Sequence, residues 1–532
     1  MSDDLSNVIS STTRGIFYLA TGNVVATLAQ AVAVFIIARL LGPELYGVYT
    51  VALSVPLLII AFIGFGIDES MVRFSANLRE KGENQAVAKV IRLGITFKAL
   101  IAIVVFIICF LLSDYIAIAI SRPDYSFYIG LASVVIVFQG IFYSADTVFV
   151  SLDRTEYSAL TANIQAIIKT LLTPLLIVAG LSVIGAITGF TISYVVAGLL
   201  GGGLVFIKLY APLKNLAHKN SGVQNQTSVS LRSMLKYGFP IYIAVLLASA
   251  YAQLQPIILS FFTLDLPIGN FKAATNFGLP MVALSGSITT VLFPAFSKIN
   301  SNINQARIVF KLATKYATLI LVPVSLVVIV LSSNLVELVY GESFTQAPFF
   351  LSFYIMTYLL VGLGSLVQNS FFNGIGETMM SVKVNLVRFV VFIGLALPLT
   401  QAYSVSGLIG AILVSTLIAT MFGAYIAKNR FGITLDYRRI FLVYVAAFIS
   451  AVPLFFIASL NLFPSLVTIF LGVSIYLLVY LTLLPILGAL SKSELANFRI
   501  NIEKIRFLKF IMGPILKYEN KLVDYAQKSN GA

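Results

Sequence analysis

Long apolar stretches alternate with short polar connections along almost the whole chain. An apolar stretch of roughly 20 residues is long enough to cross a bilayer as a helix. Fourteen stretches reach that length, at about residues 15–41, 45–66, 86–112, 127–150, 158–180, 184–210, 234–262, 269–296, 308–331, 346–370, 381–403, 406–427, 440–461 and 464–488. The pattern predicts an all-α polytopic membrane protein with about 14 transmembrane helices.

Short sequence patterns of the first half return in the second half at nearly constant spacing. Residues 184–187 (Ile-Gly-Ala-Ile) match residues 409–412, and Gln30, Gly47 and Phe74-Ser75 match Gln253, Gly269 and Phe296-Ser297. The offsets are 225, 223, 222 and 222 residues. Such an internal repeat predicts two homologous halves, which in membrane proteins usually surround a central pathway. The chain therefore has the organisation of a transporter.

The repeat and the polar connections predict the division of the chain. An N-terminal lobe covers residues 1–210 (spans 1–6), and a polar cytoplasmic linker covers 211–233. A C-terminal lobe covers 234–430 (spans 7–12), and 431–490 form an extra helix pair (spans 13–14). Apolar residues at helical spacing between lysines and arginines predict that 491–532 form an amphipathic cytoplasmic tail on the inner leaflet, or a helix that docks a partner.

Composition and charge support a cell-membrane location. Apolar residues make up 59% of the chain and charged residues only 11%, far from the shares of a soluble domain. The net charge is +14, but the lysines and arginines concentrate in alternate connections and in the tail. The opposite connections hold little beyond Arg39, Arg122 and Lys272. This asymmetry predicts a multi-pass protein with both termini cytoplasmic and excludes a nucleic-acid footprint.

The residues needed for catalysis or metal binding are almost absent from the sequence. The chain has one cysteine, Cys109, and one histidine, His218, which lies among lysines in the linker. There is no paired carboxylate, zinc-ligand spacing or phosphate-binding glycine loop, so we expect no enzyme activity, no metal and no cofactor. The N-terminus opens with Asp3 and Asp4 and leads into a full-length span, which predicts that no signal peptide is removed.

Cations inside the predicted spans are the strongest candidates for function, because ionisable residues are costly in a membrane. Lys98 and Lys169 lie near mid-membrane, which favours a polar cavity over snorkelling or pairing with a neighbour. Arg388 is intermediate in depth. Arg39 and Lys272 lie near outer helix ends, where snorkelling is the alternative to a shared cavity. A cavity lined by Arg39, Lys98, Lys169, Lys272 and Arg388 would bind phosphate or pyrophosphate.

Acidic residues inside the spans are fewer. Asp68, Glu69 and Arg73 lie at the inner end of the second span, where they form either an ion-paired inner gate or ordinary interfacial charges. Asp146 lies well inside the fourth span without an obvious partner. It is the candidate for coupling transport to an H⁺ or Na⁺ gradient, and the alternative is a carboxylate close enough to the surface to stay hydrated.

Residues 38–49, Ala-Arg-Leu-Leu-Gly-Pro-Glu-Leu-Tyr-Gly-Val-Tyr, close the first span and open the second. This segment resembles the hallmark of the polysaccharide-transporter branch of the multidrug/oligosaccharidyl-lipid/polysaccharide flippase superfamily, the Wzx-like flippases. Similarity continues in 64–67, 73–74, 235–240 and 291–297. Structurally, the same segment predicts a tight turn, with Gly47 allowing close packing.

The resemblance implies two six-helix bundles around a central cavity. It also implies transport of a polyprenyl-linked oligosaccharide from the inner to the outer leaflet, with membrane lipids and glycan-assembly enzymes as partners. A small-molecule or drug antiporter of the same superfamily is the main alternative, although the scarcity of acids in the spans counts against it. A membrane-embedded glycan polymerase or ligase would need a large outer loop, and a scaffold would not need lysines at mid-membrane.

Overall fold

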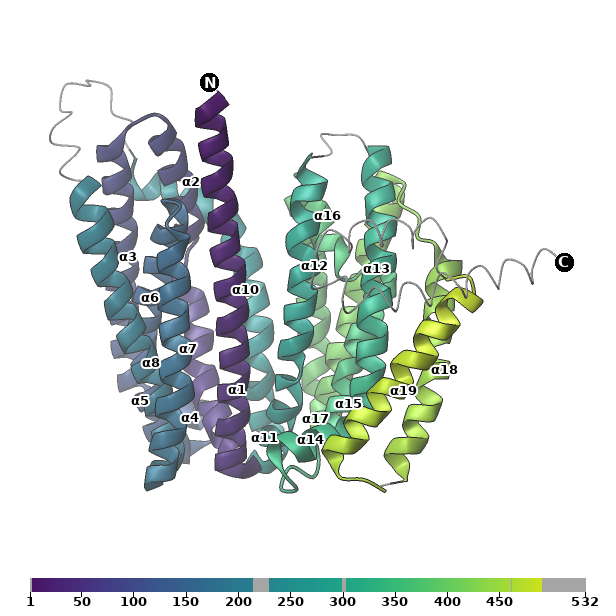
Figure 1. Cartoon of the computed structure of the whole chain (residues 1–532). Helices are drawn as coiled ribbons and strands as arrows, with labels where there is room; N and C mark the ends of the chain where they lie inside the picture. Colours follow the sequence, from purple (N-terminus) through teal and green to yellow (C-terminus); the bar gives the residue numbers. More distant parts are fainter. Residues whose placement is uncertain (1, 214–228, 299–302, 461, 490–532) are drawn as a thin grey trace. The chain divides into compact units, whose positions relative to one another are not determined.

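The computed structural model describes residues 2–213, 229–298, 303–460 and 462–489. Within these ranges the chain is helical and contains no β-strand. The helices are α1 (Ser2–Ile63), α2 (Ile67–Glu80), α3 (Asn84–Leu111), α4 (Ser113–Ala119), η1 (Pro123–Tyr125), α5 (Ser126–Ser133), α6 (Val135–Ser151), α7 (Thr155–Leu176), η2 (Ile177–Leu181), α8 (Ser182–Leu204), η3 (Val205–Tyr210), α10 (Leu231–Phe262), α11 (Asp265–Asn276), α12 (Gly278–Lys298), α13 (Ile303–Val330), α14 (Ser332–Tyr340), α15 (Ala347–Ile355), η4 (Met356–Leu363), α16 (Val367–Gly374), α17 (Thr378–Phe431), α18 (Tyr437–Ser459) and α19 (Ser465–Ile486) (Figure 1). The predicted amphipathic tail, His218 and most of the predicted linker lie outside the described residues.

The all-helical membrane fold predicted from the sequence is confirmed. Among the described residues, nine helices are long and apolar enough to cross a membrane. The number is ten if Ala347–Leu363 and Val367–Gly374, bent by 46°, count as one span. Each of the fourteen predicted segments lies on described helices, but several neighbouring pairs run together into one long helix. The count of fourteen therefore stays a prediction.

Local breaks in the long helices mark the turns between predicted spans. Gly42 divides α1 with a φ of 73°, and Ser404 divides α17 with a φ of 55°. Ser182, at the junction of η2 and α8, has a φ of 46°. A left-handed residue cannot continue a right-handed helix, so each of these positions reverses the chain direction. The tight turn predicted at Gly42-Pro43 is thus confirmed.

These turns also correct the register of the repeat. Ser182 and Ser404 adopt the same unusual backbone conformation 222 residues apart. Gly185 and Gly407, each three residues later, both pack so tightly on the preceding helix that a Cβ would overlap its backbone. Gly185 is therefore the counterpart of Gly407. The match of residues 184–187 with 409–412, at offset 225, was wrong by three residues.

The described chain divides into two compact units. Unit 1 comprises Met1–Leu279 and Phe389–Ala411, and unit 2 comprises Pro280–Arg388 and Ile412–Ala532. In unit 1 a core of buried aliphatic and aromatic side chains joins α2, α3, α6 and α10 around Met71, Val90, Phe149 and Met234. In unit 2 a separate core joins α12, α13, α16 and α17 around Phe310, Phe371 and Val384. The lobe boundaries predicted from the repeat remain predictions.

Asp436 anchors the start of α18 in unit 2. Its carboxylate accepts a hydrogen bond from the Arg439 backbone N–H at 3.3 Å, and Lys311 and Arg439 each lie 3.5 Å from it. Partial burial opposes ionisation of Asp436. The Arg439 N–H and the two cations outweigh that effect, so the pKa of Asp436 lies below its ordinary value.

A carboxylate whose pKa is lower in the folded state stabilises the fold above its unfolded pKa, and this stabilisation is lost as the pH falls through the folded pKa. We expect Asp436→Asn to lower the stability near neutral pH by about 1 kcal/mol, because asparagine can keep the N-cap hydrogen bond but loses the attraction to Lys311 and Arg439. Thermal unfolding in detergent should show this difference near pH 7 and a smaller one below about pH 3.5. An equal difference at both pH values would contradict the assignment.

Candidate functional site

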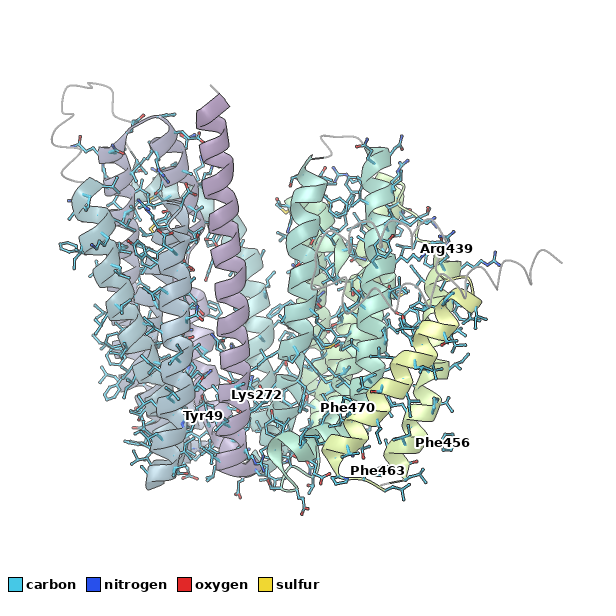
Figure 2. The ribbon with its side chains drawn as sticks, viewed as in Figure 1. Tyr49, Lys272, Arg439, Phe456, Phe463 and Phe470 are labelled. Atoms are coloured by element: carbon cyan, nitrogen blue, oxygen red, sulfur yellow. The ribbon has the colours of Figure 1, made fainter. Side chains whose placement is uncertain are left out.

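Two lysines on different helices of unit 1 form the core of the candidate site. Lys169 lies on α7 with only 8% of its surface exposed, and Lys272 lies half-buried on α11. Both helices pack against α1, and the two ammonium groups interact electrostatically with each other. The structure therefore brings together two of the five predicted cavity cations. Lys272 and Tyr49 lie toward the end of unit 1 away from the N-terminus of α1 (Figure 2).

A chain of aromatic side chains leads away from Lys169. The Lys169 Nζ lies 5.0 Å from the centre of the Phe190 ring, and the Phe190 ring lies 5.2 Å from that of Tyr194. Tyr194 is a neighbour of Tyr143 and Tyr49, and the Tyr49 ring stacks on Tyr46 at 5.8 Å. A ring face attracts a cation. The Phe190 ring thus stabilises Lys169 in part, but it carries no formal negative charge.

The charge of the lysine pair is not balanced within the described ranges. Neither Lys169 nor Lys272 has a carboxylate within ion-pairing distance there. Two like charges held together in a poorly hydrated place are costly, and such charges persist in membrane proteins mainly where function requires them. An anion placed between the ammonium groups would remove this cost and accept charge-assisted hydrogen bonds. The arrangement is therefore suited to bind a phosphate-like group.

Lys98 occupies a different polar site in unit 1. It is 5% exposed on α3, and its Nζ donates hydrogen bonds to Asp68 Oδ1 at 2.7 Å and Oδ2 at 2.6 Å. Thr147 Oγ1 on α6 donates to the same carboxylate at 3.1 Å. Of the two arrangements considered for Lys98, the structure shows pairing with a neighbour. A role of Lys98 in substrate binding stays a prediction.

Asp146 lies beside this ion pair. Its carboxylate accepts a hydrogen bond from Ser158 on α7 and interacts electrostatically with Asp68. Two carboxyl groups thus lie near each other, and of the two the structure shows Asp68 bonded to Lys98. A half-buried group of this kind could take up a proton or Na⁺, which would balance the charge.

The three residues of the predicted inner gate do not pair with one another. Asp68 bonds Lys98, while the Arg73 guanidinium lies over the Tyr237 ring of α10 at 4.1 Å. Burial raises the pKa of Glu69, and the nearby Asp68 carboxylate also raises it. The backbone N–H of Glu69 and the Lys98 ammonium lower this pKa, but by less. These residues lie on α2, at the end of unit 1 near the start of α1 (Figure 1).

The two remaining predicted cations are placed separately. Arg39 is exposed on α1, one turn before the break at Gly42. Arg388 is half-buried on α17 and belongs to unit 2. Within the described residues, no group of three His, Cys, Asp or Glu side chains could hold a metal ion.

Several functional candidates were not found from the sequence. Phe190 is not predicted as a partner of Lys169, because it lies on the next predicted span at no fixed spacing from it. Arg122 was counted only as an outward charge, yet it contacts Thr263 and Asp265. The sequence signal for this contact is that Arg122 and Asp265 carry opposite charges and lie in connections of the two predicted halves.

An all-helical membrane bundle with an internal repeat and a pair of lysines between its helices is typical of a membrane transporter. Residues 12–300 match the family described as "Polysaccharide biosynthesis protein", and the chain belongs to this family. This match confirms the resemblance to the polysaccharide-transporter branch noted from residues 38–49.

A curated relative is the probable low-salt glycan biosynthesis flippase Agl15 of Haloferax volcanii. It is 21% identical over 303 residues, which are 56% of this chain and 62% of the relative. The matched region thus spans under two thirds of that protein.

Solved transporter structures share the fold. A lipid II flippase MurJ in an inward closed conformation has a TM-score of 0.66 at 16% identity, over 87% of this chain and 97% of that one. An inward-facing multidrug resistance MATE family transporter of the MOP superfamily has a TM-score of 0.60 at 18% identity, over 76% and 94% of the two chains. At such identities the likeness concerns the fold alone.

Proposed function

We propose that the protein is a flippase for a polyprenyl-(pyro)phosphate-linked oligosaccharide. It moves the glycan from the inner to the outer leaflet by alternating access, for surface polysaccharide or glycoprotein assembly, and it catalyses no covalent reaction. The family match and the relative Agl15, named as a glycan biosynthesis flippase, support this substrate class. Glycan-assembly enzymes are the proposed partners, because they supply and consume such a substrate.

The observation that carries the proposal is the uncompensated pair Lys169 and Lys272. Phosphate is the charged group common to all lipid-linked oligosaccharides, and two ammonium groups can bind it from both sides. Tyr194 lies next to the Phe190 ring that contacts Lys169, and its ring and hydroxyl suit a sugar next to the phosphate. An organic cation would be repelled from this place.

The alternative is a small-molecule or drug antiporter on the same fold. Asp68 and Asp146 support it, since paired acids inside a bundle bind cations. The two functions differ in the charge of the substrate. A glycan flippase needs the lysine pair for the substrate, whereas an exporter of organic cations needs the acids.

Reconstitution tests the proposed function directly. The purified protein in liposomes should expose a lipid-linked oligosaccharide to an outside glycosidase or lectin faster than protein-free liposomes do. A fluorescent organic cation serves as the competing substrate in the same vesicles. Transport of the cation without exposure of the glycan would favour the antiporter and contradict the proposal.

Coupling to an ion gradient is proposed for Asp146. Asp146→Asn mimics the protonated carboxyl at nearly constant size, so we expect glycan exposure that no longer responds to an imposed pH or Na⁺ gradient. Flipping rates measured with and without each gradient check this. Glu156→Gln is the control, because Glu156 pairs with Arg154 in an exposed position of the same unit. A gradient response equal to that of the parent would exclude Asp146 as the coupling residue.

The predicted orientation places both termini in the cytoplasm. Single cysteines at Ser121 and Asn225, introduced after replacing Cys109, should react with an impermeant thiol reagent from outside and from inside, respectively. Asn225 lies outside the described residues, so its reaction reports sidedness only. Reaction of the Asn225 cysteine from outside would invert the topology.

A further inference from the structure

The two halves of the repeat meet at a pair of equivalent glycines. Gly47 on α1 and Gly269 on α11 differ by 222 in residue number, the same offset as the turns at Ser182 and Ser404. A Cβ on Gly47 would lie 2.1 Å from the Asp265 carbonyl oxygen, and a Cβ on Gly269 would lie 1.7 Å from that of Pro43. The two backbones are therefore in direct contact, at a distance that no side chain permits.

The contact continues along both helices. Asn276 Nδ2 donates a hydrogen bond to the Tyr46 hydroxyl at 2.9 Å, and the Phe35 and Phe277 rings lie 5.4 Å apart. Asn276 and Tyr46 are both buried. We call this line of contacts between α1 and α11, from Gly47 to Phe35, the repeat seam.

A polar latch closes one end of the repeat seam. Arg122, in the turn after α4, donates a hydrogen bond to the Thr263 carbonyl oxygen, and its Nη2 lies 3.6 Å from Asp265 Oδ1. Both side chains are at least four-fifths buried. Ser260 Oγ also donates to the Ile120 carbonyl oxygen at 3.2 Å. The latch thus joins the turn between predicted spans 3 and 4 to the turn between predicted spans 7 and 8.

The repeat seam is connected to the lysine pair through α11. Lys272 follows Gly269 by three residues, which is about one helical turn. A movement that separates α11 from α1 would therefore carry Lys272 away from Lys169, which is held on α7. Repulsion between the two ammonium groups favours this separation, and the latch opposes it.

We propose that the repeat seam is the outer gate of the transporter, that Arg122 latches it, and that the two-lysine site is complete only while the gate is shut. An anion bound between Lys169 and Lys272 then stabilises the closed gate, because it binds the closed state more tightly than the open one. The coupling to an anion rests on the proposed function, whereas the latch does not. A loaded substrate would thus keep the outer side sealed until the latch breaks.

The opening of the gate can be measured with a buried cysteine. Ala273 is fully buried on α11, so a cysteine there, with Cys109 replaced by Ser, should react with an impermeant reagent only when the repeat seam opens. We expect Arg122→Gln to raise the labelling rate from outside about tenfold, the change that corresponds to about 1.4 kcal/mol. Arg79→Gln is the matched control, because it breaks the exposed Arg79–Asp153 ion pair of the same unit.

Ser260→Ala provides a milder variant should Arg122→Gln fold poorly. It removes the Ser260 hydroxyl, which donates to the Ile120 carbonyl oxygen and, within α10, to that of Ile257. It should raise the labelling rate by a smaller factor. Folding is checked by gel filtration and by the unfolding temperature. If both variants are folded and label as slowly as the parent, the latch is overturned.

Inorganic pyrophosphate tests the coupling to the lysine pair. It should slow labelling of the parent and of Arg122→Gln, and should have no effect on Lys272→Gln. Unchanged labelling of the Arg122→Gln protein with saturating pyrophosphate would overturn the coupling. Because labelling needs no glycan, a protein that fails to flip the glycan but shows both effects would overturn the proposed function and leave the gate intact.

Discussion

Replacing Lys169 or Lys272 by Gln is expected to lower the rate of glycan flipping about tenfold or more, and replacing both about a hundredfold or more, since one charge-assisted hydrogen bond contributes roughly 1.5–3 kcal/mol. The reason is the lost attraction for the phosphate group as the substrate enters the bundle. The initial rate of glycan exposure in liposomes measures the effect. The same variants should unfold at the same temperature as the parent or higher, because each removes one of two repelling buried charges.

A matched substitution separates this effect from a general loss of charge. Lys89 is exposed on α3 of the same unit, so Lys89→Gln should change neither flipping nor stability. If the Lys169→Gln and Lys272→Gln double variant flips glycan at the parental rate, the lysine pair does not bind the substrate. A fall in flipping that follows a fall in unfolding temperature would equally count against the site.

We expect the lysine substitutions to lower the flipping rate without lowering the unfolding temperature, because the two lysines serve binding rather than stability. Removing one member of a buried ion pair usually costs stability, because the other charge is left buried without a partner. Lys169 and Lys272 have no such partner in the described ranges, and only the Phe190 ring offsets the burial of Lys169. Binding sites commonly contain groups that lower the stability of the protein when no ligand is bound. The substrate is the natural counter-charge.

Much of the fold follows from local features of the sequence. Each apolar segment of about 20 residues lies on a helix, since a membrane leaves the backbone few other ways to satisfy its hydrogen bonds. The sequence predicts a tight turn at Gly42 and close packing at Gly47. Gly42 has a φ of 73°, and a Cβ on Gly47 would overlap the Asp265 carbonyl oxygen. Each of these features depends on a single residue and can therefore be predicted from the sequence alone.

The partners of the charged residues could not be predicted in this way. Lys98 bonds Asp68, 30 residues earlier, because α2 and α3 pack side by side. Arg73 was grouped with Asp68 and Glu69 by proximity in sequence, yet its position on α2 directs it to Tyr237 on α10. The repeat was recognised, but its register at residues 184–187 required the backbone angle of Ser182. Side-chain pairing depends on the rotation of neighbouring helices, which no spacing rule supplies.

The Asp68–Lys98 ion pair is expected to respond unequally to the loss of its two members. Only 7% of the Lys98 side chain is exposed, compared with 32% of that of Asp68. Asp68→Asn leaves an ammonium buried without its carboxylate and should cost about 3–5 kcal/mol of stability. Lys98→Gln should cost less, about 1–2 kcal/mol, because Asp68 keeps its hydrogen bond from Thr147 and remains partly hydrated.

The double variant Asp68→Asn, Lys98→Met separates the loss of the ion pair from the cost of leaving one charge buried without its partner. It removes both charges, so we expect a stability within about 1.5 kcal/mol of the parent, as is usual when an apolar side chain replaces a buried charge of similar volume. Unfolding temperatures in detergent, combined in a double-mutant cycle, give the coupling between the two residues. Equal losses for both single variants would show that burial does not set the cost. If Lys98→Gln is as stable as the parent but no longer flips glycan, then the ion pair is not structural, and Lys98 leaves Asp68 during transport to act on the substrate.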